Sequence, residues 1–265
     1  MMGATPQGAR TEREAAVQVR GMFARVAHRY DLANHLLSFN IDRLWRARTV
    51  RRVRDILARE DARVLDICCG TGDLALALAE GGRARVAGSD FCHPMLTGAR
   101  EKMGKLKQPV GHALACPLFE ADALNLPLRD SALDLITVAF GFRNLANYAA
   151  GLAEMRRVLK PGGMAAILEF SQPPNRLFAA LYNFYSRRVL PWIGGAISGS
   201  RNAYRYLPES VRRFPGAAEL ADAMRRAGFA EVRYEFFTGG IVALHTGTAR
   251  RAESHSEIPG AGQIL

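Results

Sequence analysis

The sequence predicts an α/β fold in which a mostly parallel, seven-stranded sheet carries helices on both faces. Short apolar runs that are typical of buried strands alternate with stretches of helical periodicity over residues 60–249. A glycine-rich turn joins the first apolar run to the first helix of this region. Ligands of open parallel sheets bind outside the carboxyl ends of the strands, so we expect the functional site at that edge.

The helices that precede the sheet are expected to form a cap over this edge. We expect residues 1–14 to be disordered and a helix over 15–29, followed by a turn and a second helix start within 30–37. The periodicity over 42–57 predicts a third helix, with Trp45 facing inward and most of its arginines facing outward. Residues 15–59 are therefore predicted to be an N-terminal helical cap.

The core elements follow in order along the chain. Strands are predicted over residues 64–68, 85–89, 118–121, 133–139 and 164–170, and helices over 73–80, 94–105 and 147–159. The run Lys160-Pro161-Gly162-Gly163 is expected to end the last of these helices. An aromatic-rich insertion over 171–215 is expected to cover the ligand edge, and a helix over 217–227 leads to a final antiparallel hairpin (232–237 and 241–246). Residues 250–265 form a tail outside the domain.

The turn after the first strand is the first candidate binding site. Gly70 and Gly72 remove side chains where a ligand approaches the backbone, and the helix start offers free N–H groups. The spacing also fits a dinucleotide fingerprint of the form G-x-G-x-x-A. However, Asp66 and Asp73 place negative charge where a pyrophosphate would lie. An acidic rim suits the ammonium and sulfonium groups of S-adenosylmethionine (SAM), so these residues favour SAM over NAD.

Further candidates follow at the ends of the next strands. Asp90 ends the second strand, where a carboxylate can accept both ribose hydroxyls, and Asp122-Ala123 ends the third, where the carboxylate can meet an adenine amine. Ala139 ends the fourth strand, and Arg143 and Asn144 follow in a loop at the same edge. Each aspartate alone could be a cap or turn residue, and Arg143 could simply pair with a nearby carboxylate. Three aspartates at successive strand ends nevertheless indicate a common ligand.

Positive charge is concentrated in two segments that flank the core. Residues 1–59 contain 12 Arg and 5 acidic residues (net +7), and residues 171–215 contain 7 Arg and 1 acidic residue (net +6). The remaining residues hold 17 basic and 19 acidic side chains (net −2), so the total is +11. Such segments suit an anionic surface, either nucleic acid or acidic lipid headgroups, unless they are merely solvated.

Several classes of protein are disfavoured by the sequence. No apolar run reaches the roughly 18 residues of a transmembrane helix. Residues 1–20 contain no apolar segment typical of a secretory signal, and Glu12 and Glu14 argue against a transit peptide. The four cysteines form no C-x-x-C pair, so we expect reduced thiols in the cytoplasm and no metal site. The sequence also contains neither a Tyr-x-x-x-Lys pair for hydride chemistry nor a G-x-S-x-G elbow.

Motifs in the core and in its embellishments together resemble a known family. Those typical of class I SAM-dependent methyltransferases are residues 64–73, 122–127, 140–144 and 159–163. Motifs similar to the ubiquinone/menaquinone biosynthesis C-methyltransferase (UbiE/MenG) family are Met22-Phe23 with 29–31, and residues 41–46, 204–210 and 240–245. The resemblance extends from Val19 to Gly247, which is nearly the whole chain.

The resemblance implies the Rossmann-like class I methyltransferase fold and SAM as the cofactor, with contacts at Thr71, Asp90 and Asp122-Ala123. The family often has Ser at the position of Ala139, so only a backbone contact is expected there. The implied reaction is C-methylation of a polyprenyl quinol. We predict conversion of demethylmenaquinol to menaquinol, with the equivalent methylation of a polyprenyl-methoxy-benzoquinol in ubiquinone biosynthesis as the alternative.

Roles in this reaction are assigned to three residues. Arg143 is expected to stabilise the developing phenolate, and Asn144 or Tyr30 to position a water or the ring hydroxyl.

We expect a cytoplasmic protein that binds peripherally at the inner face of an anionic membrane. We expect no nucleic acid as a partner, and we leave open whether the protein forms a homo-oligomer. An RNA-binding methyltransferase, which would stack bases on aromatics between 178 and 206, and an NAD-dependent oxidoreductase are the alternatives of another class.

Overall fold

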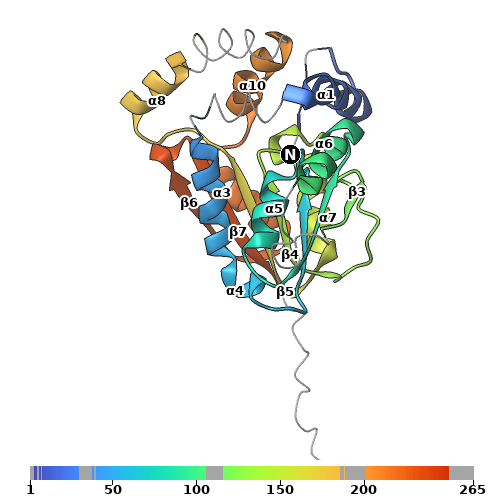
Figure 1. The fold of residues 1–265 in the computed structure, drawn as a ribbon. Helices are drawn as coiled ribbons and strands as arrows, with labels where there is room; N and C mark the ends of the chain where they lie inside the picture. Colours follow the sequence, from blue (N-terminus) through green and yellow to red (C-terminus); the bar gives the residue numbers. More distant parts are fainter. Residues whose placement is uncertain are drawn as a thin grey trace, which may run out of the picture.

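The computed structural model describes residues 3–4, 6, 8–29, 38, 40–105, 116–185, 188 and 201–250. Its centre is a seven-stranded sheet with the order β3-β2-β1-β4-β5-β7-β6 (Figure 1). Strands β1 to β5 pair in parallel, and β7 runs antiparallel to both of its neighbours, β5 and β6. The predicted α/β fold with a final antiparallel hairpin is therefore confirmed.

The strands match the apolar runs, and the largest differences are at the starts of the fifth and sixth strands and at the end of the seventh. They are β1 (Arg63–Ile67), β2 (Arg85–Asp90), β3 (Leu118–Glu120), β4 (Leu133–Ala139), β5 (Leu159–Phe170), β6 (Phe229–Phe237) and β7 (Val242–Ala249). Strand β5 begins at Leu159 and not at the predicted Met164, because Leu159 pairs with Leu133 across a register shift. Gly162 takes a φ of 80° within this stretch, which only glycine adopts without strain.

The helices also follow the predicted order. They are α1 (Glu12–Val26), α3 (Ile41–Arg52), α4 (Arg54–Leu57), α5 (Asp73–Glu80), α6 (His93–Gly104), α7 (Tyr148–Val158), α8 (Arg176–Phe184), α10 (Arg201–Arg213) and α11 (Ala217–Arg226), with the short helices η1 (Ala27–Arg29), η3 (Phe142–Asn144) and η5 (Thr238–Gly240). Helix α1 begins inside the segment expected to be disordered, because the Thr11 side chain caps it by accepting from the Glu14 N–H at 3.1 Å. The predicted helix over 42–57 is divided at Val53.

Each face of the sheet is covered by its own hydrophobic cluster. On one face, Ile136 of β4 packs with Leu152 of α7 and Leu220 of α11. On the other, Leu135 packs with residues of α3 and α5, such as Leu78. Neighbouring residues of a strand point to opposite faces, so β4 is buried on both sides.

A third group of helices lies beyond the carboxyl ends of the parallel strands. Helices α1, α8 and α10 gather there, at the upper end of the molecule in Figure 1. They come from the N-terminal segment and from the described part of the insertion over 171–215. Helices α3 and α4 instead pack beside α5 on one face of the sheet, so the prediction that residues 15–59 cap the ligand edge is only partly right (Figure 1). Within the described chain, no helix is long and apolar enough to cross a membrane.

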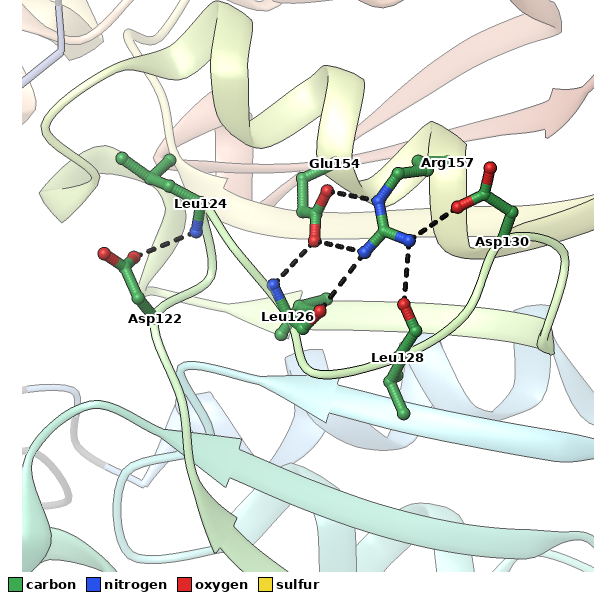
Figure 2. Close-up of polar contacts among 7 residues, drawn as sticks. All are labelled: Asp122, Leu124, Leu126, Leu128, Asp130, Glu154 and Arg157. Atoms are coloured by element: carbon green, nitrogen blue, oxygen red, sulfur yellow. Dashed lines mark hydrogen bonds and ion pairs between the residues drawn. The ribbon is translucent and has the colours of Figure 1, made fainter.

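The loop between β3 and β4 is held against α7 by one polar network (Figure 2). Arg157 Nη1 donates to the Leu128 carbonyl and to Asp130, both at 2.7 Å, and Nη2 donates to the Leu126 carbonyl at 3.2 Å. Glu154 bonds the same guanidinium and also accepts from the Leu126 N–H at 2.6 Å. The hydrogen bonds from Arg157 lower the pKa of Glu154, so the pair stays ionised and fixes the loop.

We expect Arg157→Lys to lower the free energy of unfolding by about 1–3 kcal/mol. A single ammonium group cannot replace the planar guanidinium, which forms hydrogen bonds with two carboxylates and two backbone carbonyls. Urea denaturation measures this change. Arg156→Lys is the matched control, since Arg156 donates to the Arg250 carbonyl near the end of the described chain. It should change the free energy of unfolding by less than about 0.5 kcal/mol. Equal losses in both variants would contradict the role of the network.

Candidate functional site

Two adjoining cavities open at the carboxyl ends of β1 and β4. The larger has a volume of about 320 Å³ and the smaller a volume of about 60 Å³. They share four lining residues, Cys68, Gly70, Ala139 and Phe140. An elongated ligand that occupies both cavities would therefore cross from one to the other at these four residues.

Most of the predicted site residues line these cavities. The larger is lined by Asp66, Gly70, Thr71, Ala139 and Arg143. The smaller is lined by Gly70, Asp90, Asp122, Ala123, Ala139 and Asn144. Tyr30 lies outside the described residues. The strand ends thus bring together residues that are far apart in the sequence, as the parallel sheet predicts.

Gly72 lines neither cavity, so its contact with the ligand stays a prediction. It takes a φ of 83° as the residue before α5. A Cβ at this position would lie 3.3 Å from both Ala99 Cβ and Met103 Cε of α6. The missing side chain therefore allows α6 to pack against the turn.

Asp66 is a buried carboxylate at the end of β1. Its side chain is 1% exposed, and the Thr137 hydroxyl of the neighbouring strand β4 donates to Oδ1 at 2.7 Å. Burial raises the pKa of Asp66 to about 7, against the opposing effects of Thr137 and of the Arg46 charge. A carboxylate with this pKa is easily shifted to its ionised form by a cation in the larger cavity.

Asp90 and Asp122 present carboxylates to the smaller cavity. Backbone N–H groups hold Asp90 in place, with Gly70 donating to Oδ2 and Cys92 donating to Oδ1, both at 2.8 Å. Burial raises the pKa of Asp90 to about 6. Asp122 Oδ1 accepts from the Leu124 N–H at 2.9 Å (Figure 2). Each carboxylate is thus fixed by its own turn while it borders the cavity.

Arg143 is a buried ion-pair residue at the wall of the larger cavity. Nη1 donates to Glu169 Oε1 at 2.8 Å and also to the Phe140 carbonyl, and the Arg143 backbone N–H donates to Glu169 Oε2 at 3.1 Å. The guanidinium lies 5.2 Å from the centre of the Phe170 ring. The pairing that the sequence left open is therefore real, and Glu169, which the sequence analysis missed, orients Arg143.

Asn144 turns toward the smaller cavity. Its Nδ2 is 3.5 Å from the Phe140 carbonyl, and its Oδ1 accepts from the Tyr206 hydroxyl of α10 at 3.1 Å. Arg143 and Asn144 are consecutive, but they line different cavities. The two side chains that were expected to act on one substrate therefore face different spaces.

The rim at the start of α5 is not purely acidic, and the prediction is wrong in this respect. Asp73 pairs with Lys102 Nζ at 2.5 Å and with Arg46 Nη2 at 3.2 Å. Arg46 also pairs with Asp42 on its own helix, α3. The sequence could not reveal this arrangement, because the cap brings Arg46 to the sheet edge. The larger cavity therefore contains a cation as well as the Asp66 carboxylate.

An aromatic cluster forms one wall of the larger cavity. The Phe140 ring lies 4.9 Å from that of Phe170 and 5.8 Å from that of Trp45, between ring centroids. Tyr182 of α8 and Tyr185, directly after this helix, also line this space. Phe140 has a φ of 58°, which is uncommon for a bulky residue and places its ring between the two cavities. Such a wall suits a flat aromatic ligand.

Known proteins resemble this chain over nearly its whole length. A profile of the ubiE/COQ5 methyltransferase family matches residues 10–249. A demethylmenaquinone methyltransferase of Thermus thermophilus is 49% identical over 227 residues, which cover 85% of this chain and 99% of that protein. The ubiquinone/menaquinone biosynthesis C-methyltransferase UbiE of Syntrophotalea carbinolica is 45% identical over 229 residues, which cover 86% of this chain and 92% of that protein.

Solved structures share the fold at low sequence identity. A SAM-dependent methyltransferase of Thermotoga maritima, a possible histamine N-methyltransferase, has a TM-score of 0.60 and 19% identity, covering 88% of this chain and all of that chain. The [4+2]-cyclase SpnF has a TM-score of 0.58 and 17% identity, covering 78% of this chain and 81% of that chain. A fold shared with a cyclase does not define a reaction. The profile match does define the family, because the matched residues 10–249 are most of the chain and include every residue that lines the two cavities. This chain belongs to the ubiE/COQ5 methyltransferase family.

Proposed function

We propose that this protein transfers a methyl group from SAM to a ring carbon of demethylmenaquinol. The observation that carries the proposal is the pair of adjoining cavities, one bordered by two carboxylates and the other by a buried carboxylate and an aromatic wall. Relatives named demethylmenaquinone methyltransferase support this substrate. C-methylation of a polyprenyl-methoxy-benzoquinol is the second candidate, because a relative named UbiE is nearly as similar.

The side chains around the cavities fit SAM. In the smaller cavity, Asp90 offers acceptors for ribose hydroxyls and Asp122 offers one for the adenine amine. In the larger, Asp66 would face the ammonium or sulfonium group, and Arg46 would face the carboxylate. Gly70 borders both spaces and leaves room for close approach to the backbone. When bound, SAM supplies a methyl group that is already a strong electrophile.

The chain's own residues are proposed to prepare the acceptor. The ring carbon of a quinol becomes nucleophilic as a hydroxyl proton leaves. The Arg143 guanidinium, oriented by Glu169, would stabilise the developing phenolate oxygen in a space with little water. The rings of Trp45, Phe140 and Phe170 would hold the quinol in line with the methyl group and exclude water.

The roles predicted for Asn144 and Tyr30 remain proposals, and that of Asn144 is modified. We assign Asn144 a positioning role, because it contacts the same Phe140 carbonyl as Arg143 from the side of the smaller cavity. Positioning of a water or of the ring hydroxyl by Tyr30 stays a prediction.

The polyprenyl tail of the substrate requires contact with a membrane. Each buried CH₂ group favours the lipid by about 0.8 kcal/mol, so the quinol remains in the bilayer. We propose that the protein reaches its substrate peripherally, at the membrane surface.

The reaction itself is tested with purified protein, SAM and a demethylmenaquinol, and the product is identified by mass spectrometry. We expect the product to gain one methyl group on the ring. Asp90→Asn should raise the KM for SAM at least about tenfold, because a charge-assisted acceptor for ribose is lost. Glu120→Gln is the control, since Glu120 ends β3 but borders neither of the two cavities. Methylation of the benzoquinol alone would favour the second candidate, and methylation of neither quinol would contradict the proposal.

The affinity for SAM should depend on pH through Asp66. Ligand-free Asp66 keeps its proton up to about pH 7, whereas a bound cation favours the carboxylate, so binding below that pH releases a proton. We expect SAM to bind about tenfold more weakly at pH 6 than at pH 8, as measured by calorimetry. Asp66→Asn should weaken binding and remove most of this pH dependence. An affinity of the wild type that is constant over this range would contradict the assignment.

The raised pKa of Asp66 also has a stability consequence of defined sign. A folded-state pKa of about 7, above the ordinary 3.8, stabilises the protein at low pH, and this contribution is lost as the pH rises toward 7. Without ligand, the wild type should therefore lose stability relative to Asp66→Asn over this range.

Arg143 should affect catalysis more than cofactor binding. Arg143→Lys keeps a cation beside Glu169 but removes the planar fork, so we expect kcat to fall at least about tenfold while the Kd for SAM changes less than about threefold. Arg46→Lys is the matched variant in the same cavity, and it should raise the KM for SAM with little effect on kcat. The opposite pattern in the two variants would assign Arg143 to the cofactor.

A further inference from the structure

Helix α8 carries large apolar side chains that the fold leaves exposed. Leu177, Leu181 and Phe184 are 83%, 66% and 62% exposed. Their spacing of four and three residues places them in one stripe along the helix. Of the seven large hydrophobic side chains that are exposed among the described residues, three lie on this nine-residue helix. We call these three residues the α8 stripe.

The other side of α8 belongs to the protein interior. A Cβ on Gly239 of η5 would lie 2.6 Å from Phe178 Cε1, so Phe178 packs directly on η5. Tyr182 lines the larger cavity. The helix therefore has one side at the site and another, the α8 stripe, that is exposed. It lies beyond the carboxyl ends of the parallel strands (Figure 1).

Charges beside the α8 stripe indicate what covers it. Arg176 at the start of α8 and Arg188 just beyond its end are both exposed. They belong to the segment 171–215, which contains seven arginines and one acidic residue. A short apolar stripe flanked by arginines matches the interface of an anionic bilayer, where apolar side chains enter the acyl boundary and guanidinium groups meet phosphates.

We propose that the α8 stripe docks this protein on an anionic lipid bilayer and places the mouth of the larger cavity against the lipid. The lipid contact rests on the exposed stripe and its charges alone, and only the delivery of a polyprenyl quinol past α8 rests on the proposed function. With the stripe in the acyl boundary, Tyr182 lies on the opposite side of the same helix, so a quinol has to pass a single helix to reach the aromatic wall.

Vesicle sedimentation tests the contact. The full chain is mixed with vesicles of phosphatidylcholine alone or of equal parts phosphatidylcholine and phosphatidylglycerol. We expect binding to the anionic vesicles, weaker binding in high salt, and a loss of at least about tenfold in Leu181→Glu. The control is Ala153→Glu, which adds the same charge at an exposed position of α7 and should bind like the wild type.

Activity separates this proposal from the proposed function. Leu181→Glu should lose methylation of a long-chain quinol in vesicles but keep methylation of a short-chain, water-soluble quinol. Vesicle binding by Leu181→Glu equal to that of the wild type would overturn the proposal. So would a change from dimer to monomer in Leu181→Glu without a change in lipid binding, since a second copy of the chain would then cover the stripe. If the wild type methylates neither quinol, but its binding to anionic vesicles is still lost in Leu181→Glu, the proposed function fails and the lipid contact stands.

Discussion

The site depends on the place of β1 and β4 as neighbours in the sheet. From β1 the chain continues outward to β2 and β3, and from β4 it continues to β5 on the other side. The loops after these two strands therefore diverge and leave a crevice between them. Cys68 and Gly70 follow β1, Ala139 ends β4 and Phe140 follows it, and these four residues are the ones that both cavities share. The Thr137–Asp66 hydrogen bond joins the two strands at this point.

Local patterns in the sequence were sufficient for the strands and for most residues at their ends. Strand β4 has its predicted bounds, because a mostly apolar run between two turns leaves little choice of ends. The start of α1 was missed because its stability depends on the side chain of Thr11. Glu169 could not be found from the sequence, since its pairing with Arg143 requires β5 to lie beside β4. Tertiary contacts of this kind leave no periodic signal in the chain.

Buried charges around the larger cavity are balanced in different ways. Arg143 and Glu169 form a pair that is nearly removed from solvent, and its hydrogen bonds offset much of the cost of burying two charges. The ion pairs around Arg46 likewise neutralise the start of α5. Asp66 instead has a hydroxyl donor close by and keeps its proton near neutral pH. The Asp66 carboxylate is thus a place in the larger cavity where a positively charged ligand would gain an ion pair.

The thiol of Cys68 borders both cavities, directly beside the proposed path of the methyl donor. A thiolate is the reactive form of cysteine and would compete with any acceptor for an electrophilic methyl group. Burial, together with the nearby carboxylates of Asp90 and Asp66, raises the pKa of Cys68 well above its usual value. Burial, with a smaller contribution from the aspartates that suit a cationic ligand, therefore keeps this thiol protonated. Burial at the junction of the two cavities thus makes this cysteine a poor nucleophile toward the methyl donor that the site is built to hold.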